Sequence, residues 1–178
     1  FKLRQDTQFE LMDIQEKTGT TFVIVTHDQE EAMTVASRVA VMDEGRLIQV
    51  DTPDRIYEAP NSVYVADFIG DVNIVQGRAD LQGDRVHINW AEGQPPIIGT
   101  SNHNFSQDQS VHFAIRPEKI SIWSDRPETS DETANIVPGQ IIDIAYLGNI
   151  STYHVELPNG QMLKAQTANT HRIARRKF

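Results

Sequence analysis

The sequence predicts an α+β protein that is mainly β, in which a short region of alternating helices and strands precedes a small all-β barrel. Two observations lead to this fold class. Helical and strand-like patterns alternate as far as Gly70. From Val72 onward, short runs of alternating apolar and polar residues recur about every eight to twelve positions, separated by turn residues. We therefore expect two domains, residues 1–70 and residues 71–178.

The composition narrows the class of protein. A chain of 178 residues can form one medium domain or two small ones. It contains no cysteine, which excludes disulfides, thiolate metal sites and cysteine nucleophiles, and fits a cytoplasmic protein. No apolar run approaches the roughly 20 residues that cross a membrane. The net charge of −9 disfavours nucleic acid as a partner, because neutralising phosphates supplies most of that affinity.

Residues 2–17 are expected to form the first helix. Phe9 and Met12 belong to an apolar stripe among charged side chains, as in an amphipathic helix, and Gly19 stands where such a helix would end. The chain starts inside this helix with Phe1, which is not a methionine. We therefore expect it to be a fragment of a longer protein.

The next segment leads to the candidate functional residue. The apolar run within Thr21–Val25 predicts a buried strand. Asp28 is a suitable N-cap, and Glu31 three residues later resembles a capping box that starts a helix through Ala36. His27 is thus expected between a strand end and a helix start, which is where open α/β sheets bind phosphate-bearing ligands. The alternative for a lone histidine is a capping or packing role.

Two short β-rich runs follow, over residues 38–42 and 46–50. They flank Asp43-Glu44-Gly45, an acidic residue pair followed by glycine, which is typical of a tight hairpin turn. A hairpin is therefore expected between the second helix and the third.

Two further helix starts precede the domain boundary. Thr52-Pro53-Asp54 combines a capping residue, a proline for the first helical position and an acidic residue in the first turn, and this helix should end before Pro60. Ser62 can cap another helix over residues 63–69. Gly70 then marks the expected boundary.

The second part reads as a series of short strands. Pro158-Asn159-Gly160 predicts a hairpin turn, and the polar residues 125–133 predict a loop. The expected strands are residues 74–81, 85–90, 94–100, 111–115, 120–123, 140–146, 152–157 and 161–166.

One internal repeat stands out in this second part. Asn73-Ile74-Val75-Gln76-Gly77 is echoed by Asn135-Ile136-Val137-Pro138-Gly139. The two segments would mark the first strands of two related units. Chance similarity is the alternative for so short a match.

Taken together, these segments resemble the ATP-binding subunits of ATP-binding cassette (ABC) importers, and in particular their polyamine or putrescine type. Residues 8–16 are similar to that subgroup. The motifs that carry the resemblance are Thr26-His27-Asp28-Gln29-Glu30-Glu31-Ala32, Met42-Asp43-Glu44-Gly45-Arg46, Tyr57-Glu58-Ala59-Pro60, Val65-Ala66-Asp67-Phe68-Ile69-Gly70, Ile115-Arg116-Pro117-Glu118 and Tyr146-Leu147-Gly148-Asn149. Sugar, iron and sulfate importers share most of them.

The resemblance implies a fold and a role for each part. Residues 1–70 would be the C-terminal piece of an α/β nucleotide-binding domain, and residues 71–178 an OB-like regulatory domain of the transport-associated (TOBE) kind that lacks its last strands. His27 would be the switch histidine, which positions the γ-phosphate and the attacking water. No Gly-rich loop ending in Lys-Ser or Lys-Thr occurs, so this fragment alone is expected to be inactive, with no cofactor-binding residue and no metal site.

The implied partners are those of an importer. The complete protein would use ATP and Mg²⁺, dimerise with a second copy, contact transmembrane permease subunits and serve a periplasmic substrate-binding protein. It would lie on the cytoplasmic face of the bacterial inner membrane. The alternatives are an ATPase of a sugar, iron or sulfate importer, or a stand-alone OB-like module that binds a small ligand. The remaining histidines, His87, His103, His112, His154 and His171, show no ligand spacing.

Overall fold

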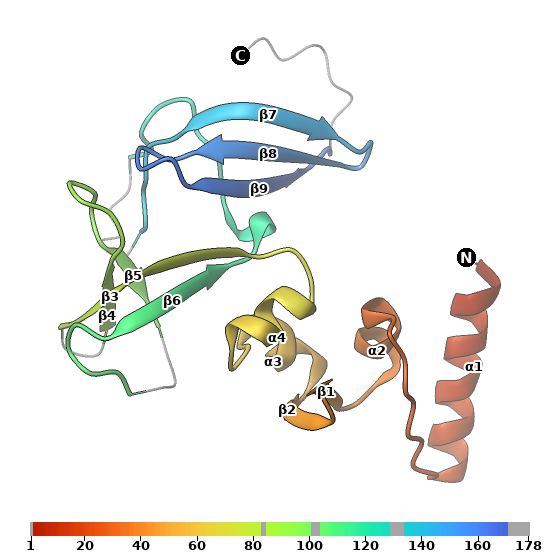
Figure 1. The fold of residues 1–178 in the computed structure, drawn as a ribbon. Coiled ribbons are helices and arrows are strands. Elements are labelled where there is room, and N and C mark those ends of the chain that lie inside the picture. The colour runs from red at the N-terminus through yellow and green to blue at the C-terminus, as the bar shows by residue number, and fades with distance from the viewer. Residues whose placement is uncertain (1, 83–84, 101–103, 129–133, 171–178) are drawn as a thin grey trace. The chain divides into compact units, whose positions relative to one another are not determined.

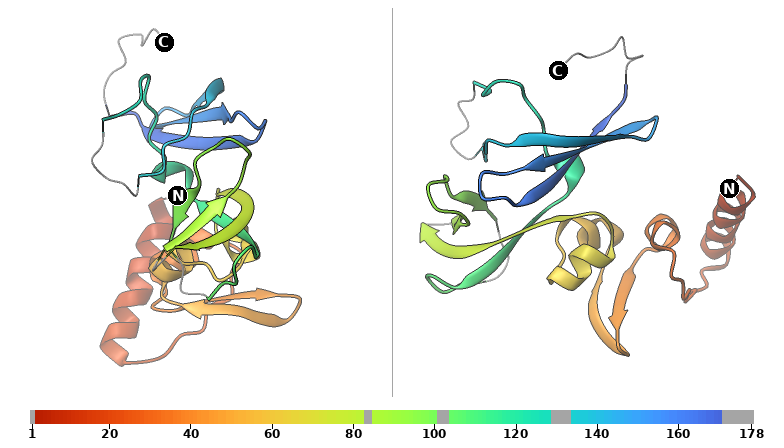
Figure 2. Two further views of the ribbon diagram at one scale, coloured as in Figure 1. Left: turned by 90° about the vertical axis from the view of Figure 1, so that its left-hand side faces the viewer. Right: turned by 45° about the horizontal axis from the view of Figure 1, so that its top comes forward.

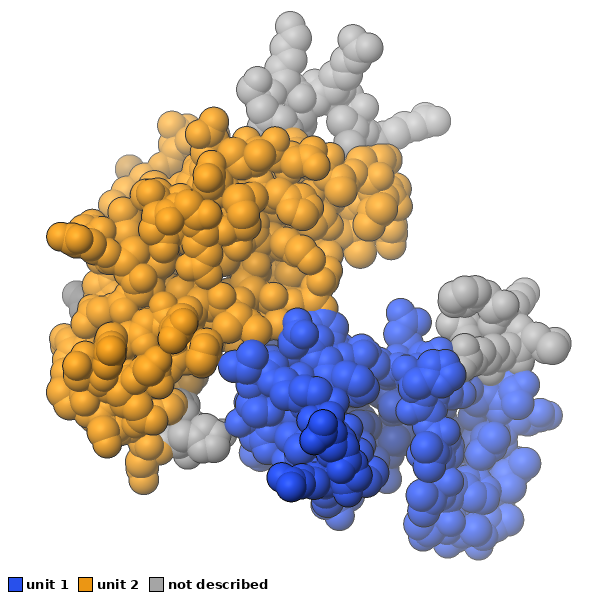
Figure 3. All heavy atoms as spheres, viewed as in Figure 1, with its two compact units in different colours: residues 1–70 blue, residues 71–178 orange. Residues whose placement is uncertain are grey.

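A computed structural model describes residues 2–82, 85–100, 104–128 and 134–170 of the chain, with side chains from residue 7 onward. The chain divides into two compact units, residues 1–70 and residues 71–178 (Figure 3). The assignment of these parts to a piece of an ATPase and a regulatory domain stays a prediction. No helix in the described ranges is long and apolar enough to span a bilayer.

The first predicted helix is present as α1 (Lys2–Thr18). It ends at Gly19, whose φ of +63° lies in the left-handed region and whose N–H donates to the carbonyl of Gln15 at 2.9 Å. The apolar stripe is real but covers no core. Phe9 and Ile14 remain 62% and 52% exposed.

The predicted strand over Thr21–Val25 is wrong: these residues form no strand. Val23 is 89% exposed and Val25 is 95% exposed, so neither face of the segment is covered. A strand is stabilised by hydrogen bonds to a neighbouring strand, and none of the strands that the structure describes lies beside this segment.

The predicted hairpin is confirmed. Strands β1 (Val39–Asp43) and β2 (Arg46–Asp51) pair in antiparallel fashion, with Asp43 opposite Arg46. Glu44 and Gly45 have φ values of 44° and 75°, as a tight two-residue turn with left-handed residues requires. The helix before this hairpin, α2 (Gln29–Val35), is also present.

The two remaining helices of this unit close its core. They are α3 (Pro53–Glu58) and α4 (Val63–Phe68), as predicted, and the Ser62 hydroxyl caps α4 by accepting the N–H of Val65 at 3.3 Å. Thr52 occupies the cap position of α3 but its side chain accepts no backbone bond there. The buried core consists of Val39, Val41, Ile56, Val65 and Ile69.

The second unit consists of antiparallel strands in two twisted sheets (Figures 1 and 2). The first sheet has the order β5-β4-β3-β6 and the second the order β7-β8-β9. Among the described residues no strand pairs with the outer edge of β7. The strands are β3 (Asn73–Gln82), β4 (Arg85–Asn89), β5 (Ile97–Gly99), β6 (Ser110–Ile115), β7 (Gln140–Tyr146), β8 (Ile150–Glu156) and β9 (Met162–Ala168).

Two strand predictions in this unit need correction. The expected strand over residues 120–123 is wrong: a 3₁₀ turn over Pro117–Lys119 leads into an irregular segment, and Trp123 is 66% exposed. The strand expected over residues 94–100 is shortened to β5, because Pro95 and Pro96 lack the N–H groups that a ladder needs.

The other turn and loop predictions fare better. The turn at residues 158–160 is confirmed: Gly160 has a φ of 81° and donates its N–H to the carbonyl of Leu157 at 2.8 Å. Residues 125–128 are irregular, as expected, while the rest of that predicted loop, 129–133, lies outside the described residues. The core of this unit contains Val75, Ala79, Ile88, Ile97 and Val111.

Candidate functional site

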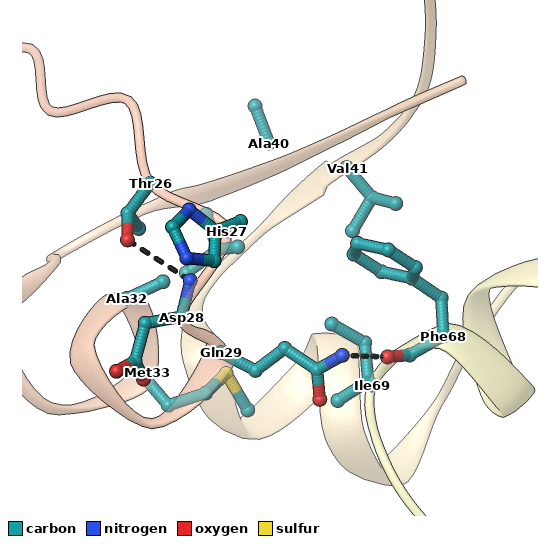
Figure 4. Close-up of a pocket in the computed structure, with 11 residues that line it drawn as sticks. Thr26, His27, Asp28, Gln29, Ala32, Met33, Ala40, Val41, Phe68 and Ile69 are labelled. Carbon is teal, nitrogen blue, oxygen red and sulfur yellow. Dashed lines mark hydrogen bonds between the residues drawn. The ribbon is translucent and has the colours of Figure 1, made fainter.

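The backbone on both sides of His27 is fixed by hydrogen bonds from its neighbours (Figure 4). The hydroxyl of Thr26 accepts the N–H of Asp28 at 3.0 Å and donates to a carboxylate oxygen of Glu31 at 2.7 Å. Hydrogen bonds on both sides of a residue reduce the number of backbone conformations that it can adopt. The backbone at His27 is therefore restricted, although the residue belongs to no helix or strand.

Asp28 starts α2 as its N-cap, as predicted. Its carboxylate accepts the N–H of Glu31 at 3.0 Å, and its extended backbone (φ −93°, ψ 108°) is typical of a cap. The carboxylate of Asp28 is thereby engaged at the start of α2 rather than directed to a ligand. The side chain of His27, between the half-buried Thr26 and Asp28, is exposed.

A shallow hollow of about 60 Å³ lies beside this turn, between α2, β1 and the end of α4. His27, Met33, Val41 and Phe68 contribute to its lining (Figure 4). The side-chain amide of Gln29 donates to the carbonyl of Phe68 and so ties the start of α2 to the end of α4. A volume of this size holds water but no nucleotide, so a nucleotide would have to approach His27 from its exposed side.

The chemistry open to His27 is that of an accessible imidazole. When neutral, one ring nitrogen donates a hydrogen bond while the other accepts one. A phosphate oxygen and a water molecule are suitable partners for such a pair. Within the described ranges, no group of three or more histidine, aspartate or glutamate residues is placed to hold a metal ion.

The other histidines that the structure describes lie in the second unit. His87 lies half-buried on β4, His112 is exposed on β6 and His154 is half-buried on β8. These three belong to the second unit. His103 and His171 lie outside the described residues.

Sequence reasoning missed two contributors to the site. The capping-box pattern relates Glu31 to the cap residue Asp28 and does not indicate that the Glu31 carboxylate accepts a hydrogen bond from the Thr26 hydroxyl. The contact between Gln29 and Phe68 joins residues far apart in the chain, and no local pattern indicates it. The sequence signal for the bond between Thr26 and Glu31 was the position of Thr26, a hydroxyl residue two positions before the cap residue Asp28.

Two comparisons with known proteins bear on this arrangement. Residues 113–177 match the family described as the TOBE domain. The match falls within the second unit. The predicted fold class, mainly β with a small OB-like domain, is confirmed by this match together with the strands of that unit.

The full chain is similar to named importer proteins. It is 42% identical over 172 residues, 96% of its length, to the putrescine transport ATP-binding protein PotG of Escherichia coli. The resemblance to importer ATP-binding proteins is confirmed. Identity is 38% over 97% of the chain with the spermidine/putrescine import ATP-binding protein PotA of Rubrobacter xylanophilus, and 37% over 94% of the chain with PotA 2 of Pseudomonas aeruginosa. The chain spans 45–46% of the length of these relatives.

Proposed function

We propose that this chain is the C-terminal part of the ATP-binding subunit of an ABC importer, and that the complete protein couples ATP hydrolysis to the uptake of putrescine or spermidine. The observation that carries the proposal is similarity over nearly the whole chain to proteins named for polyamine import. ATP and Mg²⁺ are bound elsewhere in the complete subunit, because the 178 residues contain no phosphate-binding loop.

Within that function His27 acts as the switch histidine. Its imidazole donates a hydrogen bond to the γ-phosphate and helps to position the attacking water. Three features support this role: the side chain is exposed, the backbone around it is fixed through Thr26, and Asp28 is engaged as a helix cap. His27 is a catalytic residue of the complete enzyme, and the 178-residue chain alone does not turn over ATP.

The partners follow from the same proposal. The subunit works on the cytoplasmic face of the bacterial inner membrane with permease subunits and a periplasmic substrate-binding protein. The β-rich unit regulates it and meets its counterpart in a second copy. Its exposed apolar residues at the β7–β8 turn, Tyr146 at 61% and Leu147 at 68%, support a contact surface there.

The test of the His27 assignment is a substitution in the complete subunit. His27→Ala should lower the rate of ATP hydrolysis roughly 100-fold or more, the effect of removing one donor that acts on developing charge. The dissociation constant for ATP should change little, because the main phosphate-binding residues lie elsewhere. His112→Ala, also an exposed histidine, is the matched control and should hydrolyse ATP normally. Normal hydrolysis in His27→Ala would show that the histidine is structural.

A further inference from the structure

The echo between residues 73–77 and 135–139 extends to strand register. The residue after Gly77, Arg78, lies opposite Asn89 of β4. The residue after Gly139, Gln140, lies opposite Glu156 of β8. Residues 73–77 lie within β3 and residues 135–139 precede β7, but in both cases the pairing with the next strand of the chain, β4 or β8, starts at the residue after the glycine.

Both glycines also approach the neighbouring strand in the same way. A Cβ atom at Gly77 would come within 2.5 Å of Ile88 Cγ2, and one at Gly139 within 2.5 Å of Val155 Cγ1. The residues touched stand one position before Asn89 and Glu156, the partners in the register above. Only glycine fits such a close approach of two strands.

The correspondence continues to the third strand of each group, which is β5 after β3 and β4, and β9 after β7 and β8. Ile88 lies opposite Ile97 of β5, and Val155 lies opposite Leu163 of β9. The residue after each of these, Ile98 or Lys164, has its backbone N–H and carbonyl bound by an asparagine side chain.

The two asparagines bind across, each to the other set of strands. Asn73, which opens the first echo, donates to the carbonyl of Lys164 at 2.8 Å and accepts its N–H at 2.7 Å. Asn135, which opens the second, donates to the carbonyl of Ile98 at 2.9 Å and accepts its N–H at 2.7 Å. An asparagine amide carries one donor group and one acceptor, like a peptide unit, so it can replace a strand partner for one residue.

We propose that the β-rich unit contains two equivalent half-units, residues 73–99 and 135–168, joined by the reciprocal exchange of asparagine side chains, with β6 as an additional strand beside β3. The side chain of Asn73 binds the backbone of Lys164, and the side chain of Asn135 binds the backbone of Ile98. Each half-unit is the specific partner of the other, and each supplies the hydrogen bonds that the third strand of the other lacks at that residue.

Chance similarity over a short segment does not account for these coincidences. It would leave the register, the glycine contacts and the targets of the asparagines unrelated. Instead, all three agree along the first, second and third strand of each half-unit, and the asparagine bonds cross in both directions. The halves differ in burial: Asn73 is 6% exposed, whereas Asn135 is exposed.

Amide hydrogen exchange of the full 178-residue chain, followed residue by residue by NMR, tests the proposal. Asn73→Ala should speed exchange of the Lys164 amide about tenfold and leave the Ile98 amide unchanged. Asn135→Ala should speed exchange at Ile98 and leave Lys164 unchanged, with a smaller effect because water can replace an exposed side chain. Asn89 is exposed on β4, and its side chain has no hydrogen bond to any residue that the structure describes. Asn89→Ala is therefore the control and should change neither amide.

The conservative variant Asn73→Asp distinguishes the loss of these asparagine hydrogen bonds from a general loss of folding. Asn73→Asp keeps an acceptor for the Lys164 N–H but loses the donor to its carbonyl, so protection of Lys164 should fall between those of the wild type and Asn73→Ala. If Asn73→Ala does not fold, the exposed Asn135→Ala together with Asn73→Asp decides. Faster exchange confined to the half-unit that carries the substitution, or no change at either amide, would overturn the proposal.

Discussion

At the scale of single residues, Thr26 and Asp28 determine how His27 is presented. One hydroxyl serves both as acceptor for Asp28 and as donor to Glu31, so the loop before α2 and the first turn of α2 are joined at one atom. Since the imidazole itself makes none of these bonds, it can be replaced without dismantling the turn. Substitutions at His27 should therefore affect activity with little effect on stability, whereas substitutions at Asp28 should affect stability.

Replacing Asp28 tests that separation from the side of stability. Asp28→Ala removes the side-chain bond to the N–H of Glu31 and should lower the free energy of unfolding of the first unit by about 1 kcal/mol. Asp28→Asn, whose side chain is an equally good cap, should stay within about 0.5 kcal/mol of the wild type. Urea denaturation of the three proteins measures both values. Equal losses for Ala and Asn would show that the charge, and not the cap, matters.

A second residue-scale prediction concerns Asp80. Hydrogen bonds from the side chains of Gln82 and Gln107, at 2.8 and 3.0 Å, hold the pKa of the Asp80 carboxyl below its ordinary value, with a smaller contribution from the charge on His87. A folded-state pKa that is lowered gives stability that is present above the ordinary pKa and is lost as the pH falls through the folded-state value. The second unit should therefore lose stability below about pH 4.

Asp80→Asn is the comparison for this pH dependence. The amide does not titrate, so the variant should show a flatter fall in the urea midpoint between about pH 5 and about pH 2. Parallel curves for the wild type and the variant would rule out a contribution from Asp80.

At the scale of elements, turns and helix caps could be predicted from the local sequence, whereas the pairing of distant segments could not. The turn at Glu44-Gly45 and the cap at Ser62 were predictable because each depends on a few neighbouring residues. The segment Thr21–Val25 has the composition of a strand, but strands need partners, and the structure supplies none among the described residues. His27 could be located from its motif, whereas the contact of Gln29 with Phe68 depends on the fold of the whole unit.

The exposed segment makes an element-scale prediction. In the 178-residue chain, the amides of residues 21–25 should exchange with solvent at nearly the rate of an unstructured peptide, because no strand hydrogen bonds protect them. Amides of β1, which pairs with β2, are the internal reference. Strong protection over residues 21–25 would mean that the segment finds a strand partner, within the chain or in a second copy.

The close approach of β3 and β4 at Gly77 leads to a second prediction at this scale. Gly77→Ala places a Cβ within 2.5 Å of Ile88 Cγ2 and 2.7 Å of the backbone oxygen of Asn89, so it should destabilise the second unit by about 1–3 kcal/mol. Gly99→Ala is the control, since its Cβ would meet Phe113 only at 3.5 Å, an ordinary contact distance. Thermal unfolding of both variants gives the comparison. A tolerated Gly77→Ala would show that β3 and β4 can move apart at no cost.

At the scale of the whole molecule, each unit has its own core and its own expected role. The first unit carries the candidate catalytic histidine on a turn between an exposed segment and α2. The second unit carries the TOBE match and the crossed asparagine bonds. Neither unit contains a phosphate-binding loop, so the chemistry proposed for His27 belongs to the complete subunit.

Transport by the complete subunit would show directly whether it serves the uptake of putrescine or spermidine. Cells lacking their own polyamine importers would receive the complete subunit with its permease and binding-protein partners, and uptake of radiolabelled putrescine would be followed. We expect uptake of putrescine that depends on ATP. Excess unlabelled spermidine or putrescine should suppress this uptake, whereas maltose, iron and sulfate should leave it unchanged. Uptake of a sugar, iron or sulfate with no uptake of putrescine or spermidine would contradict the proposed function.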